Sequence, residues 1–146
     1  MSDLALFDTG ILLRASTTTL DHADLGLALW NQARLGTLRA CIAQQTVWEF
    51  FSVLTRLGTP PRHVLAEIRK HLAVFPVIAP KPTTFPDVLA SLGRLRWLGG
   101  PQVYDLLLAH TALDNGIATL CTFNDRHFRR FVLPLQVVNP TTMRTR

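Results

Sequence analysis

The sequence predicts an α/β fold in which a central, mostly parallel, five-stranded sheet is covered by helices on both faces. Short apolar runs alternate with longer amphipathic segments along the whole chain. The runs do not alternate polar with apolar residues, which indicates strands that are buried on both sides. Hydrophobic residues make up 48% of the 146 residues and charged residues 17%, enough for one packed core. We therefore expect a single domain over residues 1–146.

The elements follow from hydrophobic periodicity and from the residues that break it. We expect strands at residues 4–7, 38–43, 74–79, 117–121 and 135–138. We expect a helical turn at 11–15 and helices at 21–35, 47–57, 61–73 and 85–98. A further helix follows Pro101 and ends at the turn 114–116, and a last helix opens at 124–125. Gly36 is expected to end the helix that precedes it.

The chain is basic, with a net charge of +5 that is carried by thirteen arginines and only two lysines. Arginine is suited to bidentate contacts with phosphate, so the composition points toward a phosphate-bearing partner. The same charge would also serve solubility alone, and composition does not separate the two readings.

The cysteines and the N-terminus indicate the compartment. Cys41 and Cys121 both fall in expected strands and lack the C-x-x-C spacing of zinc or redox sites, so they read as small buried hydrophobes. The N-terminus has no basic segment followed by a long apolar run, and no stretch is apolar enough to span a membrane. We expect a protein of the reducing cytoplasm with no membrane partner.

Four carboxylates stand out by their common placement. Asp8, Glu49 and Asp125 each follow the carboxyl end of a different expected strand, and Asp105 opens the helix that leads into the fourth strand. Each has an ordinary structural reading: Asp8 as a helix N-cap, Glu49 as part of a T-x-x-E capping box that begins at Thr46, and the other two as first-turn acids. In a parallel sheet, however, the carboxyl ends of the strands share one edge, where a crevice opens. We therefore expect the four acids to converge there.

Converging carboxylates repel one another, and a hard divalent cation such as Mg²⁺ or Mn²⁺ relieves that repulsion. A metal ion next to basic residues suits hydrolysis of a phosphodiester bond. Arg126, Arg129 and Arg130 lie beside Asp125 and would either hold the flanking backbone or form a solvated helix face. Whether one ion or two bind is left open by the sequence.

Three segments together resemble the PIN domain, and they are most similar to the VapC-type toxins of bacterial and archaeal toxin–antitoxin pairs. The segments read FDTGILLRA, QQTVWEFFSVLTR and VYDLLLAHTALDNGIATLCTFNDRHF. The likeness runs from Asp8 to Phe128. It implies a three-layer α/β/α sandwich and a Mg²⁺- or Mn²⁺-dependent endoribonuclease. It also implies a homodimer that a cognate antitoxin silences by occupying the active-site groove.

The resemblance assigns roles residue by residue. Asp8 matches the first metal-binding aspartate of the family, Glu49 its glutamate, Asp105 a direct metal ligand, and Asp125 the fourth acid, which acts on a second metal or on water. Thr9 and Asn124 match polar positions that support these acids. Gly10 departs from the family, in which a bulkier or hydroxyl residue is more usual after D-T or D-S.

Two other readings belong to different classes of function. A receiver-like signalling module would also use acids and Mg²⁺, but it needs a lysine after a late strand, and neither Lys70 nor Lys81 is placed there. A PIN-like module that binds RNA or a protein partner without turnover is the remaining alternative. Transfer, ribosomal and messenger RNA all stay open as targets.

Overall fold

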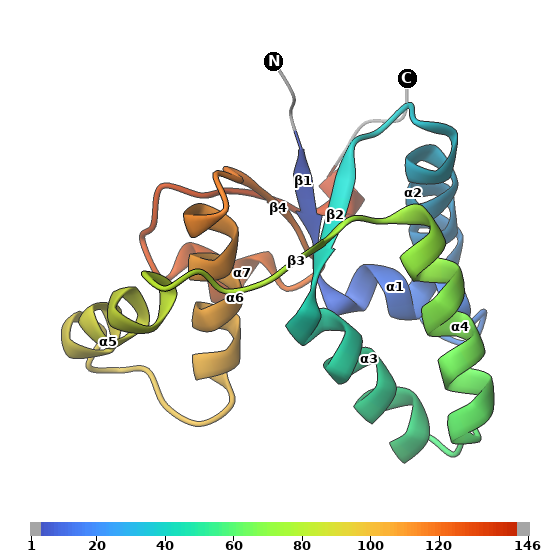
Figure 1. The fold of residues 1–146 in the computed structure, drawn as a ribbon, viewed down its shortest axis with the longest axis horizontal. Coiled ribbons are helices and arrows are strands. Elements are labelled where there is room, and N and C mark those ends of the chain that lie inside the picture. The colour runs from blue at the N-terminus through green and yellow to red at the C-terminus, as the bar shows by residue number, and fades with distance from the viewer. Residues whose placement is uncertain (1–3, 143–146) are drawn as a thin grey trace.

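The computed structural model describes residues 4–142, which form a five-stranded, all-parallel sheet with helices on both faces (Figure 1). The strands are β1 (Ala5–Phe7), β2 (Ala40–Ala43), β3 (Val77–Ile78), β4 (Thr119–Cys121) and β5 (Gln136–Val138). The helices are α1 (Thr9–Ser16), α2 (Ala23–Leu35), α3 (Gln44–Arg56), α4 (Pro61–Val74), α5 (Thr84–Arg94), α6 (Gln102–Asp114), α7 (Asp125–Arg129) and the 3₁₀ helix η1 (Pro140–Thr142). The predicted three-layer fold is confirmed.

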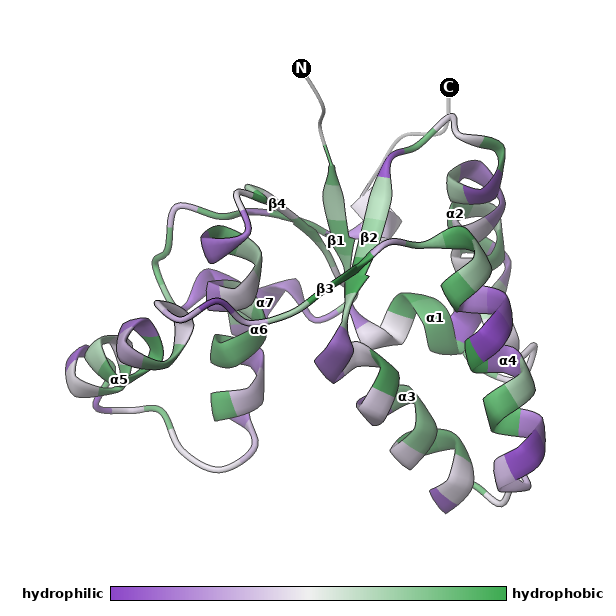
Figure 2. Ribbon diagram, viewed as in Figure 1, coloured by the Kyte–Doolittle hydropathy of each residue, from purple (hydrophilic) through white to green (hydrophobic). Residues whose placement is uncertain are grey.

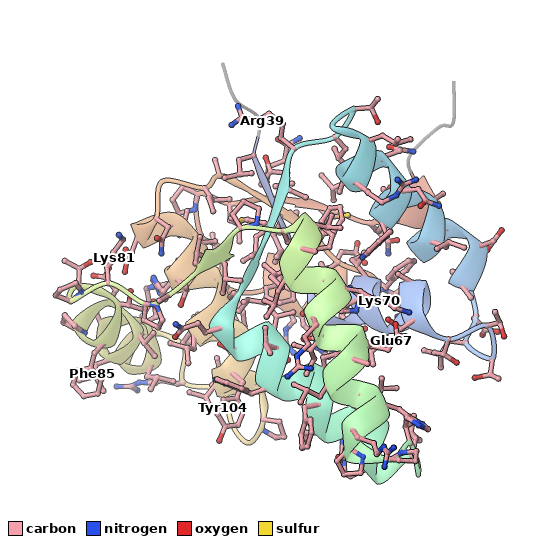
Figure 3. The ribbon with its side chains drawn as sticks, turned by 45° about the vertical axis from the view of Figure 1, so that its right-hand side comes forward. Arg39, Glu67, Lys70, Lys81, Phe85 and Tyr104 are labelled. Atoms are coloured by element: carbon pink, nitrogen blue, oxygen red, sulfur yellow. The ribbon has the colours of Figure 1, made fainter. Side chains whose placement is uncertain are left out.

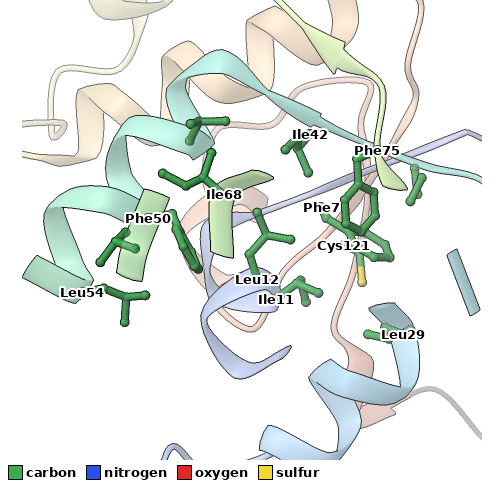
Figure 4. Packing of buried hydrophobic residues seen from close by; sticks show 14 residues of the cluster. Phe7, Ile11, Leu12, Leu29, Ile42, Phe50, Leu54, Ile68, Phe75 and Cys121 are labelled. Carbon is green, nitrogen blue, oxygen red and sulfur yellow. The ribbon is translucent and has the colours of Figure 1, made fainter. Parts of the chain in front are cut away.

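The two faces of the sheet bury two separate hydrophobic clusters. Ala5 and Phe7 point toward α1–α4, while Leu6 between them points toward α5–α7, as the alternation of side chains along a strand requires. Strands β1, β2 and β3 are apolar along their whole length, whereas β4 and β5 each begin with a polar residue, Thr119 and Gln136. The helices lie in two groups on either side of the strands (Figure 1), and green, hydrophobic residues dominate β1 and β2 (Figure 2). In the first cluster, Phe7 packs against Phe75 with ring centroids 5.6 Å apart (Figure 4).

A buried histidine organises the polar part of the first cluster. His71, on α4, is only 3% exposed, and its ring packs edge-on against Phe50. Trp30 Nε1 donates a hydrogen bond of 3.0 Å to His71 Nδ1, and Ser16 Oγ lies 3.0 Å from Nε2. Burial lowers the pKa of His71 to about 4, so the ring is neutral and joins α1, α2 and α4.

Several predicted boundaries move, although every predicted strand exists. Only Val77–Ile78 of the strand expected at 74–79 pairs with β2, because α4 runs on to Val74. The strand expected at 38–43 begins two residues later, since the amide of Leu38 still bonds to the carbonyl of Gln32 at the end of α2. The helix expected at 85–98 ends at Arg94.

Other local expectations are confirmed. Gly36 ends α2 in the left-handed region with φ of 80°. Cys41 and Cys121 are free and buried in strands, and burial raises the pKa of both thiols. Within the described residues, the helices are all too short or too polar to cross a bilayer.

Gly26 allows α2 to pack closely against α1. A Cβ atom at Gly26 would lie 2.5 Å from Cβ of Arg14 and 3.0 Å from its carbonyl carbon, a space that only a backbone shift can provide. Gly93, in α5, has open space around it.

We expect Gly26→Ala to lower the free energy of unfolding by about 1–3 kcal/mol. Gly93→Ala should raise it by up to about 1 kcal/mol through helix propensity. Denaturant unfolding of both variants measures the difference, and equal effects would contradict this account of the α1–α2 contact.

Candidate metal-binding active site

The order of the strands brings separate parts of the chain to one place. The sheet runs β3-β2-β1-β4-β5, so the connections turn in opposite directions on the two sides of β1. A crevice forms at the carboxyl ends of the strands at such a reversal. A pocket of about 730 Å³ lies there. Its lining includes Asp8, Thr9, Gly10, Arg14, Glu49, Arg56, Tyr104, Asp105, Asn124 and His127.

Asp8 sits at the end of β1 and is fixed by two hydrogen bonds. The amide of Thr9 donates to its Oδ1 at 2.7 Å, as expected of an N-cap on α1, and Thr122 Oγ1 donates to its Oδ2 at 2.8 Å. Thr122 follows β4 and is itself buried. The carboxylate is therefore held by one donor from the start of α1 and one from the segment after β4. The residue is only 7% exposed.

Glu49 is oriented toward Asp8 by a second threonine contact. Thr9 Oγ1 donates to Glu49 Oε2 at 2.8 Å, and Gln45 Nε2 donates to Oε1 at 2.7 Å. The capping box predicted for residues 46–49 is wrong, because α3 begins at Gln44 directly after β2 and Thr46 lies inside the helix. One contact from α1 and one from the preceding turn of α3 thus hold the Glu49 carboxylate at the pocket.

Asp105 enters from the first turn of α6. Its Oδ2 lies 3.5 Å from Nδ1 of His127, which comes from α7. Gln45 Nε2 also donates to the backbone oxygen of Tyr104, so α3 and α6 are linked directly beside the acids. The pocket is therefore assembled from the end of β1 and from α1, α3, α6 and the start of α7.

Asp125 is placed differently from the other three acids. It lines an adjoining hollow of about 380 Å³, and its carboxylate accepts hydrogen bonds from Asn139 Nδ2 at 2.9 Å and Arg129 Nε at 3.2 Å. Both hydrogen bonds lower the pKa of Asp125, and the one from Asn139 has the larger effect. Asn124 lines both hollows. The structure thus brings Asp8, Glu49 and Asp105 together and sets Asp125 to one side.

Burial dominates the electrostatics of Asp8 and Asp105. It raises the pKa of Asp8 to about 6, with the charges of Asp105 and Glu49 acting in the same direction and the hydrogen bonds from Thr122 and Thr9 opposing it. Burial also raises the pKa of Asp105, and the charge and hydrogen bond of His127 offset only part of this rise. These carboxylates carry their negative charge unfavourably in the absence of a cation.

Of the three arginines that the sequence singles out, Arg126 lines the hollow beside Asp125, and the other two are engaged elsewhere. Arg129 bonds to Asp125 and to the carbonyl of Val137, and the guanidinium of Arg130 lies 3.8 Å above the ring of Trp97. Arg14 and Arg56 line the pocket instead. The sequence pattern did not single out these two, although Arg14 lies on α1, which Asp8 caps, and Arg56 follows Glu49 on α3. His127 and Gln45 were also missed, though Gln45 lies one helical turn before Glu49 and His127 lies two residues after Asp125.

The donor set suits a hard divalent cation. Three carboxylates, a threonine hydroxyl and an asparagine side chain face one pocket, and one of the acids is buried with a raised pKa. No three of the described acidic, histidine or cysteine side chains are already close enough to ligate one ion together.

Comparison with known proteins places this fold. The PIN domain family model matches residues 5–132. A search of curated proteins found no match. Among solved structures, VapBC2 from Rickettsia felis bound to a promoter DNA fragment is 19% identical, with a TM-score of 0.70 over 93% of this chain and 98% of that one. A toxin–antitoxin complex from Klebsiella pneumoniae is 22% identical, with a TM-score of 0.63 over 93% and 97%. VapC20 of Mycobacterium tuberculosis, a sarcin-ricin loop cleaving toxin, is 13% identical, with a TM-score of 0.68 over 86% and 94%.

These structural likenesses extend over most of each chain and concern the fold. The family match covers most of the sequence, including Asp8, Glu49, Asp105 and Asp125. Taken with the parallel sheet and the acids at its edge, it shows that the chain belongs to the PIN domain family.

Proposed function

We propose that the chain is a divalent-metal-dependent endoribonuclease of the cytoplasm and the toxin of a type II toxin–antitoxin pair. One observation carries the proposal: three carboxylates from distant parts of the chain face one pocket, and the innermost is buried with its pKa raised to about 6. Asp8, Glu49 and Asp105 would hold Mg²⁺ or Mn²⁺, directly or through its water ligands. Such an ion, when bound, lowers the pKa of an attacking water and stabilises charge on the phosphate.

The chain itself supplies the positioning. Thr9 and Thr122 keep Asp8 fixed, and Thr9 with Gln45 keeps Glu49 fixed, so the oxygens that face the pocket need little reorganisation. Nδ1 of His127 lies 3.5 Å from Oδ2 of Asp105 and helps to orient that carboxylate. The role proposed for Asp125 is support of the neighbouring segment, because its carboxylate is bound by Asn139 and Arg129.

The proposed partners are RNA, a cognate antitoxin and a second copy of the chain. An apolar hollow of about 410 Å³ adjoins the acidic pocket and shares Glu49 and Tyr104 with it. Trp48 and Tyr104 are 69% and 57% exposed at this place (Figure 3 labels Tyr104). Apolar surface of this kind supports contact with another protein close to the acids. The toxin–antitoxin complex from K. pneumoniae has a similar fold and supports the same view.

Cleavage of total RNA with Mg²⁺, with Mn²⁺ and with a chelator tests the activity. We expect metal-dependent cleavage that Asp8→Asn, Glu49→Gln and Asp105→Asn each reduce at least about a hundredfold. Glu67→Gln is the matched control, because Glu67 pairs with Lys70 on the surface of α4, away from the pocket (Figure 3). Asp125→Asn should retain activity within about tenfold, as expected of a supporting residue rather than a ligand.

Two results would contradict parts of this proposal. Binding of RNA without cleavage under every metal condition would favour the binding module without turnover. Cleavage by Asp8→Asn and Asp105→Asn at the rate of the parent, with both variants folded, would refute the assignment of the acids.

Asp8 also makes stability depend on pH. Its pKa is about 6 in the folded chain against an ordinary value of 3.8, so the folded state binds the proton more tightly. The contribution of Asp8 to the free energy of unfolding is therefore most favourable below about pH 4, and it is lost as the pH rises through about 6. Asp8→Asn keeps the shape of the side chain and removes this cost. In a chelator, we expect the variant to gain on the order of 2–3 kcal/mol over the parent between pH 4 and pH 7.

The readout is the difference between the two unfolding profiles. His71, with its pKa lowered to about 4, loses stability as the pH falls, and it cancels because both proteins contain it. A difference that stays constant from pH 4 to pH 7 would show that Asp8 is not titrating in this range. Added Mg²⁺ should stabilise the parent more than the variant.

A further inference from the structure

Arg14 presents a rigidly held cation to the acidic pocket. It lies on α1, less than two turns after Asp8, and three contacts fix its guanidinium group. Nε donates to the carbonyl of Asp21 at 3.0 Å, Nη1 donates to the carbonyl of Gly10 at 3.0 Å, and Cζ lies 4.1 Å from the centre of the Phe123 ring. Among the described residues, no carboxylate lies within ion-pair distance of it. Arginine has five N–H donors, so most of them are left for a ligand.

Gly10 provides the space for this arrangement. A Cβ atom at Gly10 would lie 3.0 Å from Nη1 of Arg14 and 3.9 Å from Cδ2 of Phe123. Gly10 lies inside α1 and is not one of the described glycines with positive φ, so the backbone does not require glycine there. Glycine is unfavourable in a helix. The guanidinium of Arg14 is thus the group that a side chain at Gly10 would crowd first.

The surroundings of Arg14 indicate on which side a ligand binds. Its side chain lines both the acidic pocket and an outer hollow of about 680 Å³ between α1 and α2. Asp21 and Asp24 line that outer hollow, where no metal ion is proposed to offset their charge, so a polyanion is less favoured there than in the acidic pocket. A phosphate on the inner side would meet Arg14 at the edge of the pocket that holds Asp8 and Glu49.

We propose that Arg14, seated in the space left by Gly10 and stacked on Phe123, binds a backbone phosphate of the RNA next to the one that is cut. The proposal rests on the proposed nuclease function. A planar guanidinium matches two phosphate oxygens at once, and one that is already fixed loses little freedom on binding. Arg14 is thus a positioning residue, which contributes to substrate binding in the ground state and in the transition state alike.

Removing the charge gives the first test. Arg14→Gln should raise KM about tenfold and leave kcat nearly unchanged, as loss of uniform binding does. Affinity for a short, fluorescently labelled single-stranded RNA of mixed sequence is measured in an Asp8→Asn background, in which the RNA stays intact. The slope of log affinity against log salt should become shallower by about 0.7, the loss of one phosphate contact. Arg14→Lys should recover part of the affinity and the full slope.

Arg34→Gln is the matched control for charge. Arg34 is exposed in the last turn of α2 and does not line the pocket, so its removal lowers the net charge equally but should leave KM and the salt slope as in the parent. An Arg14→Gln protein with the KM and slope of the parent would overturn the proposal.

Filling the space at Gly10 gives the second test and separates binding from folding. Gly10→Ala should push the guanidinium out of its present position by a few tenths of an ångström and weaken RNA binding. The melting temperature should not fall, because alanine is more favourable than glycine inside a helix and only the end of a side chain must shift. Gly93→Ala, with open space around it, should leave RNA binding unchanged. In an Arg14→Gln background, Gly10→Ala should have no further effect on affinity. Parental affinity of Gly10→Ala would overturn the link between the two residues.

The two proposals fail in distinguishable ways. A parent protein that cuts RNA with metal while Arg14→Gln keeps the parental KM would refute the role of Arg14 alone. A parent that binds RNA but never cuts it would refute the nuclease function, and the affinity measurements would still decide the role of Arg14.

Discussion

The carboxylate of Asp8 is taken out of water at the end of the central strand, and the rest of the site depends on how the chain accommodates it. Burial raises its pKa to about 6, while hydrogen bonds from the amide of Thr9 and the hydroxyl of Thr122 partly offset that cost. One of these donors begins α1 and the other follows β4, so the two segments that flank the crevice are joined through a single side chain. A buried, hydrogen-bonded charge of this kind fixes geometry at the expense of stability.

Thr9 also links Asp8 to the second acid of the site. Thr9 contacts Asp8 through its amide and Glu49 through its hydroxyl, so the position of α1 relative to α3 is set at the acids themselves. Gln45 then connects Glu49 to the backbone of α6, which carries Asp105. The acids are arranged by short polar contacts between neighbours, on a scaffold whose stability comes from the apolar clusters on either side of the sheet.

Much of this could be predicted from the sequence. Unbroken apolar runs between amphipathic helices gave the parallel sheet, and acids just after those runs gave the edge at which the site lies. The position of Asp125 relative to the others could not be predicted, because its partner Asn139 lies on a segment after β5 whose place beside it depends on the fold. Local patterns also misled: the T-x-x-E signature at Thr46 predicts a helix start, but β2 passes into α3 without a loop, so Thr46 is already inside the helix. The guanidinium of Arg14 occupies space beside Gly10 that a side chain there would fill. A glycine in this role does not alter the hydrophobic periodicity, so the sequence pattern does not indicate it.

Asn139 gives the segment after β5 a direct connection to the site. Its side-chain amide donates to Asp125 and, at 3.4 Å, to the backbone oxygen of Phe123, whose ring supports Arg14. Its own side-chain oxygen accepts from the amide and the hydroxyl of Thr141. One amide group thus ties the position of the segment after β5 to Asp125 and to the backbone of the residue that carries the ring beside Arg14.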